Sequence, residues 1–303
     1  MMESFGSEVD DQTIAPVPDR LDVVSVGLML CPNRNLTTLT AAVLSLHPHV
    51  QVLNHGFERL EAAGLLRFLQ SGSEVDLEAF LRGAIALSGY GRRGDYGGSI
   101  LLSHGYDRPV LRAAYAQRYG DAPFKSDIRC VVWKDGARLL EYLRANDIAA
   151  VGLAQRLPRL RFLSPLRRPV AHLRGLQRYY EPQPPDYVRP SLPDLTVESV
   201  AKYILAAHEE FLACRAQRPA QFFAYTEAEL GEQGAAALAR FLGISADETW
   251  RQLAAMFFID DGPQIDEAPE QAVFTALLNG LYPRSDLLQR WYRQATATQR
   301  APS

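Results

Sequence analysis

Short apolar runs alternate with segments of helical spacing along most of the chain, and the clearest boundary falls in residues 23–46. There the apolar run VVSVGLML passes through the polar turn CPNRNLTT into a second apolar segment. The first run is rich in apolar and β-branched residues, which is typical of a central strand covered on both faces. Four apolar residues of the second segment share one helical face: Leu39, Ala42, Val43 and Leu46. Pro48 should end that helix, so the segment predicts a strand, a loop and a helix.

The same pattern recurs downstream. Strands are predicted for residues 128–133, 160–166 and 221–225, and for the short apolar run that ends just before His55. Helices are predicted for residues 60–72, 75–87, 137–146, 196–214 and 234–244, and from about Val170 onward. Strands that alternate with helices indicate an α/β fold with a largely parallel sheet between two helical layers.

The remaining segments set the expected organisation of the chain. Residues 1–20 are acidic and polar, which predicts a flexible tail. Residues 21–303 are expected to form a single domain, with a helical C-terminal part at about 246–297. The glycine-rich stretch 88–99 predicts a loop, which is either a solvated surface loop or a mobile flap over a site. The proline-rich stretch 182–195 predicts an irregular connection.

Composition narrows the class of partner. The 303 residues are 47% hydrophobic and 22% charged, which is ordinary for a globular protein. The net charge of -3 gives no global basic field, so we expect no nucleic-acid partner, and an anionic ligand has to be held by a local cluster. Cys31, Cys130 and Cys214 are far apart and odd in number, which argues against a disulfide framework and against a zinc site. With neither a secretory signal nor a long apolar span, the chain is expected to be cytoplasmic and not membrane-bound.

Basic residues follow three of the predicted strands. They are Arg34 after the first, Lys134 after the run at 128–133, and Arg167 with Arg168 after the run at 160–166. Ligands of parallel α/β sheets bind at the carboxyl ends of the strands. We therefore expect these cations to meet at one edge of the sheet.

The first strand end also leads into a helix N-terminus, where unpaired N–H groups and the helix dipole favour a phosphate or a sulfate. Arg34 could add a bidentate contact, and the hydroxyls of Thr37 and Thr38 could donate further hydrogen bonds. The alternative is that Asn35 or Thr37 only caps the helix, which is worth about 1 kcal/mol.

An ordered set of motifs resembles the sulfotransferase family. The turn Asn33-Arg34-Asn35-Leu36-Thr37-Thr38-Leu39 resembles the family's first motif, roughly Pro-Arg/Lys-Ser-Gly-Thr-Thr-Leu. The stretch from Arg167-Arg168-Pro169 to Gly175 resembles the second motif, Arg-Asp-Pro and a helix with a serine six residues after the proline. The run VVWKDG resembles the family's lysine-containing strand, and AYTEAEL with RFLGI resembles a third region. Together they span residues 21 to about 245 in the family's order.

This resemblance implies a three-layer α/β/α fold like that of P-loop NTPases. It also implies in-line transfer of a sulfuryl group, without a metal, from 3′-phosphoadenosine 5′-phosphosulfate (PAPS) to a hydroxyl or amine. The acceptor would be a small molecule, a glycan or a peptide. The implied PAPS-binding positions are Arg34, Asn35, Leu36, Thr37 and Thr38 at the 5′-phosphosulfate, and Arg167 and Gly175 at the 3′-phosphate.

The reaction needs a base to take the acceptor's proton. His55 occupies about the place of the family's acidic residue, and its ordinary pKa of about 6.5 suits a base near neutral pH. Glu58 is the second candidate for the base. Lys134 is expected to stabilise the leaving phosphate or the transferred group.

Two positions depart from the family pattern. Leu36 stands where the family has the glycine of the turn, and we expect Asn35, which tolerates a positive φ, to make that bend instead. Gly175 stands where a serine would bind the 3′-phosphate, and Arg174 or Arg178 is expected to compensate. These departures keep a second reading open, a non-catalytic descendant that binds a nucleotide or a partner. A third, a kinase-like enzyme, is disfavoured because the turn lacks Gly-Lys-Ser/Thr and no convincing magnesium-holding aspartate follows a strand.

Overall fold

The computed structural model describes residues 21–91, 97–120, 122, 124–226, 229, 232–257 and 267–297. The tail expected at 1–20 and the middle of the loop at 88–99, with its two arginines, lie outside the described residues.

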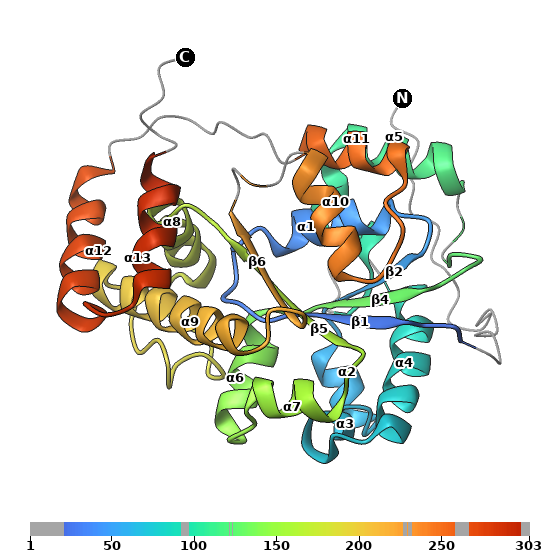
Figure 1. The fold of residues 1–303 in the computed structure, drawn as a ribbon, viewed down its shortest axis with the longest axis horizontal. Helices are drawn as coiled ribbons and strands as arrows, with labels where there is room; N and C mark the ends of the chain where they lie inside the picture. Colours follow the sequence, from blue (N-terminus) through green and yellow to red (C-terminus); the bar gives the residue numbers. More distant parts are fainter. Residues whose placement is uncertain are drawn as a thin grey trace.

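In the described part of the chain, six strands form one sheet in the order β3-β2-β4-β1-β5-β6 (Figure 1). The strands are β1 (Ser25–Met29), β2 (Val50–Asn54), β3 (Gly98–Ser99), β4 (Cys130–Lys134), β5 (Leu160–Leu166) and β6 (Phe222–Thr226). All neighbours pair in parallel except β2 and β3, which are antiparallel. The mostly parallel α/β fold expected from the sequence is therefore confirmed.

Helices cover both faces of this sheet (Figure 1). One face packs against α1 (Thr37–Ser45), the 3₁₀ turns η1 (Ile100–Leu102) and η2 (His104–Asp107), α5 (Pro109–Tyr119), α10 (Glu232–Phe241) and α11 (Glu248–Phe257). The other face packs against α2 (Phe57–Ala62), α3 (Arg67–Ser71), α4 (Glu74–Ser88), α6 (Ala137–Ala145), α7 (Ala150–Arg156), α8 (Pro169–Tyr180) and α9 (Val197–Gln217). The last two helices, α12 (Ala268–Leu281) and α13 (Asp286–Ala297), pack against α8 and α9.

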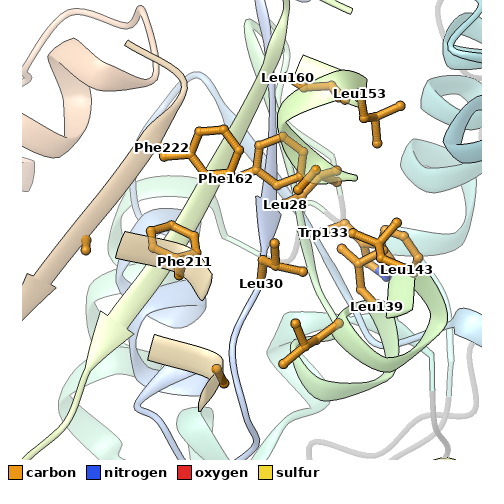
Figure 2. Close-up of a cluster of buried hydrophobic side chains, with 14 of the residues drawn as sticks. Leu28, Leu30, Trp133, Leu139, Leu143, Leu153, Leu160, Phe162, Phe211 and Phe222 are labelled. Atoms are coloured by element: carbon orange, nitrogen blue, oxygen red, sulfur yellow. The ribbon is translucent and has the colours of Figure 1, made fainter. Parts of the chain in front are cut away.

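The core is built by strand residues that alternate between the two faces. On β5, Phe162 joins the cluster under α9, whereas the next residue, Leu163, joins the cluster under α1 and α10. The Phe162 ring stacks on Phe222 of β6 with centroids 4.7 Å apart, and Phe211 of α9 packs edge-on against Phe222 at 5.6 Å (Figure 2). Burial on both faces explains why these strands appear in the sequence as nearly continuous apolar runs.

The strand order places the loop after β1 at the centre of one sheet edge. β1 lies between β4 and β5, and the chain runs from β1 outward to β2 on one side and later to β5 and β6 on the other. The loops after β1, β2, β4 and β5 therefore leave the sheet at the same edge. A reversal of strand order of this kind opens the crevice in which α/β proteins bind their ligands.

The structure also contains elements that the sequence did not predict. They are the two-residue strand β3, the turns η1 and η2, and the helices α5 and α7. The single helix expected at 60–72 is two short helices, because Gly64 takes a left-handed φ of 68° between α2 and α3. No helix among the described residues has both the length and the apolar character to cross a membrane.

Phe222→Ala tests the core between β5, β6 and α9. Phe222 is 0% exposed, and its loss leaves a cavity beside Phe162 and Phe211, so we expect the free energy of unfolding to fall by about 3–5 kcal/mol. Urea denaturation followed by circular dichroism measures the change. Leu281→Ala, on a side chain of α12 that is 54% exposed, is the control and should change stability by less than about 0.5 kcal/mol. Equal effects of the two substitutions would contradict the packing described here.

Candidate functional site

Asn35 fastens the loop between β1 and α1 to the end of β5. Its side chain is 0% exposed, its Nδ2 donates to the carbonyl of Pro165, and its Oδ1 accepts from the N–H of Arg167 at 2.8 Å. The amide is therefore used inside the protein. Asn35, predicted as a PAPS-binding residue, lies beneath the loop and does not line the pocket above it.

The bend in this loop falls on either side of Asn35. Arg34 has a φ of 60° and Leu36 a φ of 59°, so the expectation that Asn35 would take the positive φ is wrong. Asn35 keeps an ordinary φ, and its amide points down to two backbone groups of β5 and the following turn. A left-handed non-glycine residue costs on the order of 1–3 kcal/mol and persists only where its surroundings fix it. Leu36 thus makes the bend that a glycine would make more easily.

The N-terminus of α1 has no side-chain cap. Leu36 occupies the cap position, with no side-chain hydrogen bond there, and the first helical bond runs from the N–H of Thr40 to the carbonyl of Leu36 at 2.9 Å. The N–H groups of Thr37, Thr38 and Leu39 therefore lie outside the helical ladder and carry the positive end of the helix dipole. The alternative in which Asn35 or Thr37 only caps the helix is not what the structure shows.

A pocket of about 290 Å³ opens over this helix end, and we call it the basic pocket. Its lining includes the loop residues Asn33, Arg34 and Leu36 and the first residues of α1. Among the described residues, five lysines and arginines line it: Arg34, Arg108, Lys134, Arg167 and Arg168. None of its described lining residues carries a carboxylate. The predicted cations of the three strand ends do meet at one edge of the sheet.

The turn η2 and the residue after it add two basic groups that the sequence reasoning missed, His104 and Arg108. The turn packs directly on α1, since a Cβ on Gly105 would lie 3.2 Å from Thr38 and 3.3 Å from Ala42. The pKa of His104 is lowered, first by burial and then by the charges of Lys134 and Arg34. The only signal in the sequence was a glycine between two basic residues, His104 and Arg108, in a segment without regular spacing.

Lys134 and His55 are in direct contact at the ends of β4 and β2. The Nζ of Lys134 lies 2.7 Å from Nε2 of His55, and Nδ1 of His55 lies 3.5 Å from Oδ1 of the buried Asp135. The backbone of His55 is held as well, because its N–H donates to the carbonyl of Lys134 at 2.8 Å and its carbonyl accepts from Trp133 Nε1 at 2.9 Å. His55 has a φ of 58° and is followed by Gly56 with a φ of 95°. This tight turn sets the imidazole beside the lysine.

Burial controls the protonation of this pair. It lowers the pKa of Lys134 to about 8, and the nearby charge of Asp135 only partly offsets that effect. Burial also lowers the pKa of His55, with the hydrogen bond to Asp135 acting upward and the charge of Lys134 acting downward. Near neutral pH the arrangement is thus a charged lysine that donates to a neutral imidazole.

Gly175 of α8 marks a close approach. A Cβ there would lie 3.2 Å from Nη1 of Arg167 and 3.3 Å from Cβ of Arg34, and the same Nη1 donates to the Arg34 carbonyl at 3.2 Å. At this position the resemblance implies a hydroxyl that binds the 3′-phosphate. Here Gly175 packs closely against Arg34 and Arg167 instead. Arg174, expected to compensate, is bound to Glu270 of α12 at 2.7 Å, and neither it nor Arg178 lines the basic pocket.

A second pocket of about 530 Å³ adjoins the first, and both are lined by Asn33, His55 and Tyr179. The rest of its wall includes Asp135 and the stretch from Tyr180 to Tyr187. Asn33 links this wall to the β1–α1 loop, since its Nδ2 donates to the hydroxyls of Tyr180 and Tyr187 at 2.9 and 3.3 Å.

One candidate for the base lies outside both pockets. Glu58, the second candidate, pairs with Arg138 and lines neither pocket. Among the described residues, no group of three or more histidines, cysteines, aspartates and glutamates gathers as metal ligands do.

Comparison with known proteins gives a loose structural likeness. No protein-family model matches the chain, and no curated protein matches it. Among solved structures, the chain is similar to the "Sulfotransferase Domain from the Synechococcus PCC 7002 Olefin Synthase", with a TM-score of 0.40 and 13% identity. That likeness covers 94% of this chain and 98% of the other. Because this TM-score is so low, we infer the chemistry of the site from its geometry and not from this likeness.

Asn35→Ala tests the clamp between β1 and β5. It leaves the buried carbonyl of Pro165 and the N–H of Arg167 without the Asn35 amide, so the free energy of unfolding should fall by about 1–3 kcal/mol. Chemical denaturation measures this loss. Asn146→Ala, which removes an exposed amide bonded to the Tyr142 carbonyl at the end of α6, is the matched control and should cost less. If Asn35→Ala is as stable as the control, the Asn35 hydrogen bonds do not stabilise the contact between the β1–α1 loop and the end of β5.

Proposed function

We propose that this chain is a sulfotransferase that moves a sulfuryl group from PAPS to a hydroxyl or amine. The observation that carries the proposal is the basic pocket. It joins five cationic side chains and the uncapped N-terminus of α1, beside an imidazole and lysine pair. A polyanionic ligand fits such a pocket, since positioned cations and N–H groups stabilise negative charge most strongly away from water.

The two charged ends of PAPS would bind in different parts of the basic pocket. The N–H groups at the start of α1, with Arg34, Thr37 and Thr38, would hold the 5′-phosphosulfate. Arg167 and Arg168, at the end of β5, would hold the 3′-phosphate. Gly175 offers no hydroxyl to that phosphate, so its binding depends on these two guanidinium groups.

His55 and Lys134 have complementary roles in the transfer. His55 takes the proton of the acceptor through Nε2 while the acceptor atom forms its bond to sulfur. The bond from sulfur to the phosphate oxygen breaks in the same step, and the charge that grows on this oxygen is stabilised by Lys134 and Arg34. The products are the sulfated acceptor, adenosine 3′,5′-bisphosphate and one proton carried by His55.

The position of Lys134 also argues against the alternative of a kinase-like enzyme. A metal-dependent phosphoryl transferase keeps a carboxylate after the strand beside its phosphate loop, where it holds magnesium. Here β4 lies beside β1, and its last residue, Lys134, lines the basic pocket, whereas Asp135 lines the second pocket. A cation in this place suits direct stabilisation of a transferred anionic group.

Adenosine 3′,5′-bisphosphate tests the donor assignment. Its binding should raise the melting temperature by mass action, with about 2.7 kcal/mol of added stability at one hundred times Kd. ATP, which lacks the 3′-phosphate, should shift the melting temperature less at the same concentration. Differential scanning fluorimetry with both ligands gives the comparison, and no shift at millimolar adenosine 3′,5′-bisphosphate would sink the PAPS assignment.

Arginine variants place the ligand within the pocket. Arg34→Ala and Arg167→Ala should each remove about 1.5–3 kcal/mol of binding, a loss of roughly tenfold to more than a hundredfold in affinity. Arg215→Ala, on an exposed arginine in the last turn of α9, is the control and should bind as the unmodified protein does. Unchanged affinity in both pocket variants would show that the ligand binds elsewhere.

Anion binding should also depend on pH through Lys134. Its pKa is lowered to about 8 in the ligand-free protein, and an anion binds the charged ammonium better than the neutral amine. Affinity for adenosine 3′,5′-bisphosphate should therefore fall as pH rises through about 8. Calorimetric titrations between about pH 7 and pH 10 measure this, in a range where the phosphate is ionised and the arginines stay charged. Lys134→Met should bind weakly and lose this dependence, and an equal fall in that variant would assign the titration to another group.

A further inference from the structure

Lys134, His55 and Asp135 form a row that connects the two pockets. Lys134 lines the basic pocket, Asp135 lines the second pocket, and His55 lines both. The contacts along the row are 2.7 Å from Nζ to Nε2 and 3.5 Å from Nδ1 to Oδ1. A change at the lysine end can therefore reach the imidazole directly.

We propose that Asp135 is a positioning residue for His55, and that an anion in the basic pocket draws Lys134 away from Nε2 of His55. This nitrogen then serves as the base for an acceptor in the second pocket. The identity of the reaction rests on the proposed function, but the coupling between anion and imidazole can be observed without turnover.

The direction of the hydrogen bonds follows from the groups themselves. An ammonium only donates, so Nε2 of His55 accepts from Lys134. A carboxylate only accepts, so Nδ1 of His55 carries the proton that faces Asp135. This tautomer leaves the lone pair on the nitrogen that a base requires, and in the ligand-free protein that lone pair is occupied by Lys134.

Asp135 is placed to hold this tautomer. It is 2% exposed, and its Oδ2 makes no hydrogen bond to any described residue, so the carboxylate has few alternatives to the imidazole. The backbone of His55 is fixed at the same time by its bonds to Trp133 and Lys134. The ring is thus constrained from its backbone and from Nδ1, whereas the contact at Nε2 is made by the flexible side chain of Lys134.

The anion acts through charge. Arg34 repels Lys134 across the basic pocket, while Asp135 attracts it from the other side, and a bound anion would add an attraction on the side of the basic pocket. The groups that face His55 are Lys134, Asp135, His104 and Arg138, and Arg138 is already paired with Glu58. Lys134 and His104 line the basic pocket, so an anion there weakens the positive charge felt by His55. The pKa of His55 should rise as a result, which makes it a stronger base once the donor is in place.

The experiment is nuclear magnetic resonance of the full chain labelled with ¹⁵N-histidine, with the His55 signals assigned by His55→Gln. In the ligand-free protein we expect His55 to carry its proton on Nδ1. Saturation with adenosine 3′,5′-bisphosphate, and separately with inorganic sulfate, should raise the pKa of His55. The rise should be smaller in Lys134→Met, where only the direct effect of the anion remains, and in Asp135→Asn the proton should redistribute between the two nitrogens.

A similar pair at the opposite edge of the sheet provides the matched control. Nδ1 of His49 lies 3.1 Å from Oδ2 of Asp127, just before β2 and β4 begin. Asp127→Asn should therefore alter the His49 signals and leave His55 and its response to anions unchanged. A changed His55 signal in that variant would show that the probe reports on the whole fold, which would overturn the local assignment.

The outcomes separate the two proposals. If His55 carries its proton on Nε2 in the unmodified protein, or if Asp135→Asn leaves its tautomer unchanged, Asp135 has no positioning role. If an anion saturates the pocket and the titration of His55 does not move, Lys134 is not withdrawn. A response to sulfate without binding of adenosine 3′,5′-bisphosphate would retain the coupling and overturn the PAPS assignment. Binding of neither anion would overturn both the coupling and the proposed function.

Discussion

The buried amide of Asn35 is the interaction on which the geometry of the site depends. It joins the loop after β1 to the end of β5 through the Pro165 carbonyl and the Arg167 N–H. One side chain thereby fixes the start of α1 relative to the turn that carries Arg167. The two cationic parts of the basic pocket come from segments about 130 positions apart, and this contact holds them at a constant separation.

The second constraint is the repulsion among the cations that the fold brings together. No described carboxylate lines the basic pocket, so its positive charge is not balanced within the lining itself. Burial is the largest cause that lowers the pKa values of Lys134, His55 and His104, and neighbouring positive charges lower them further, although Asp135 acts in the opposite direction on Lys134 and His55. An anion bound there would reduce this repulsion.

The sequence predicted the parts of the site that follow long apolar strands. Arg34, Lys134 and Arg167 come directly after such strands, and parallel pairing alone is enough to bring strand ends together. The contributions of His104 and Arg108 escaped prediction because η2 is short, has no regular spacing, and is placed by tertiary packing of Gly105 on α1. The positive φ values of Arg34 and Leu36 could not be predicted for a related reason. The loop is held by the hydrogen bond from Asn35 to Pro165 of β5, which is distant in the sequence.

The two departures from the family pattern are physically connected. Leu36 and Arg34 both take left-handed conformations, and the resulting loop sets the side chain of Arg34 against α8. A Cβ at position 175 would lie 3.3 Å from Arg34 Cβ and 3.2 Å from Arg167 Nη1, so a side chain at that point would require these neighbours to shift by a few tenths of an ångström. The leucine in the loop and the glycine on the helix are therefore parts of one packing arrangement. A serine introduced at position 175 alone would crowd both arginines, whereas glycine there leaves Arg34 and Arg167 in the lining of the basic pocket.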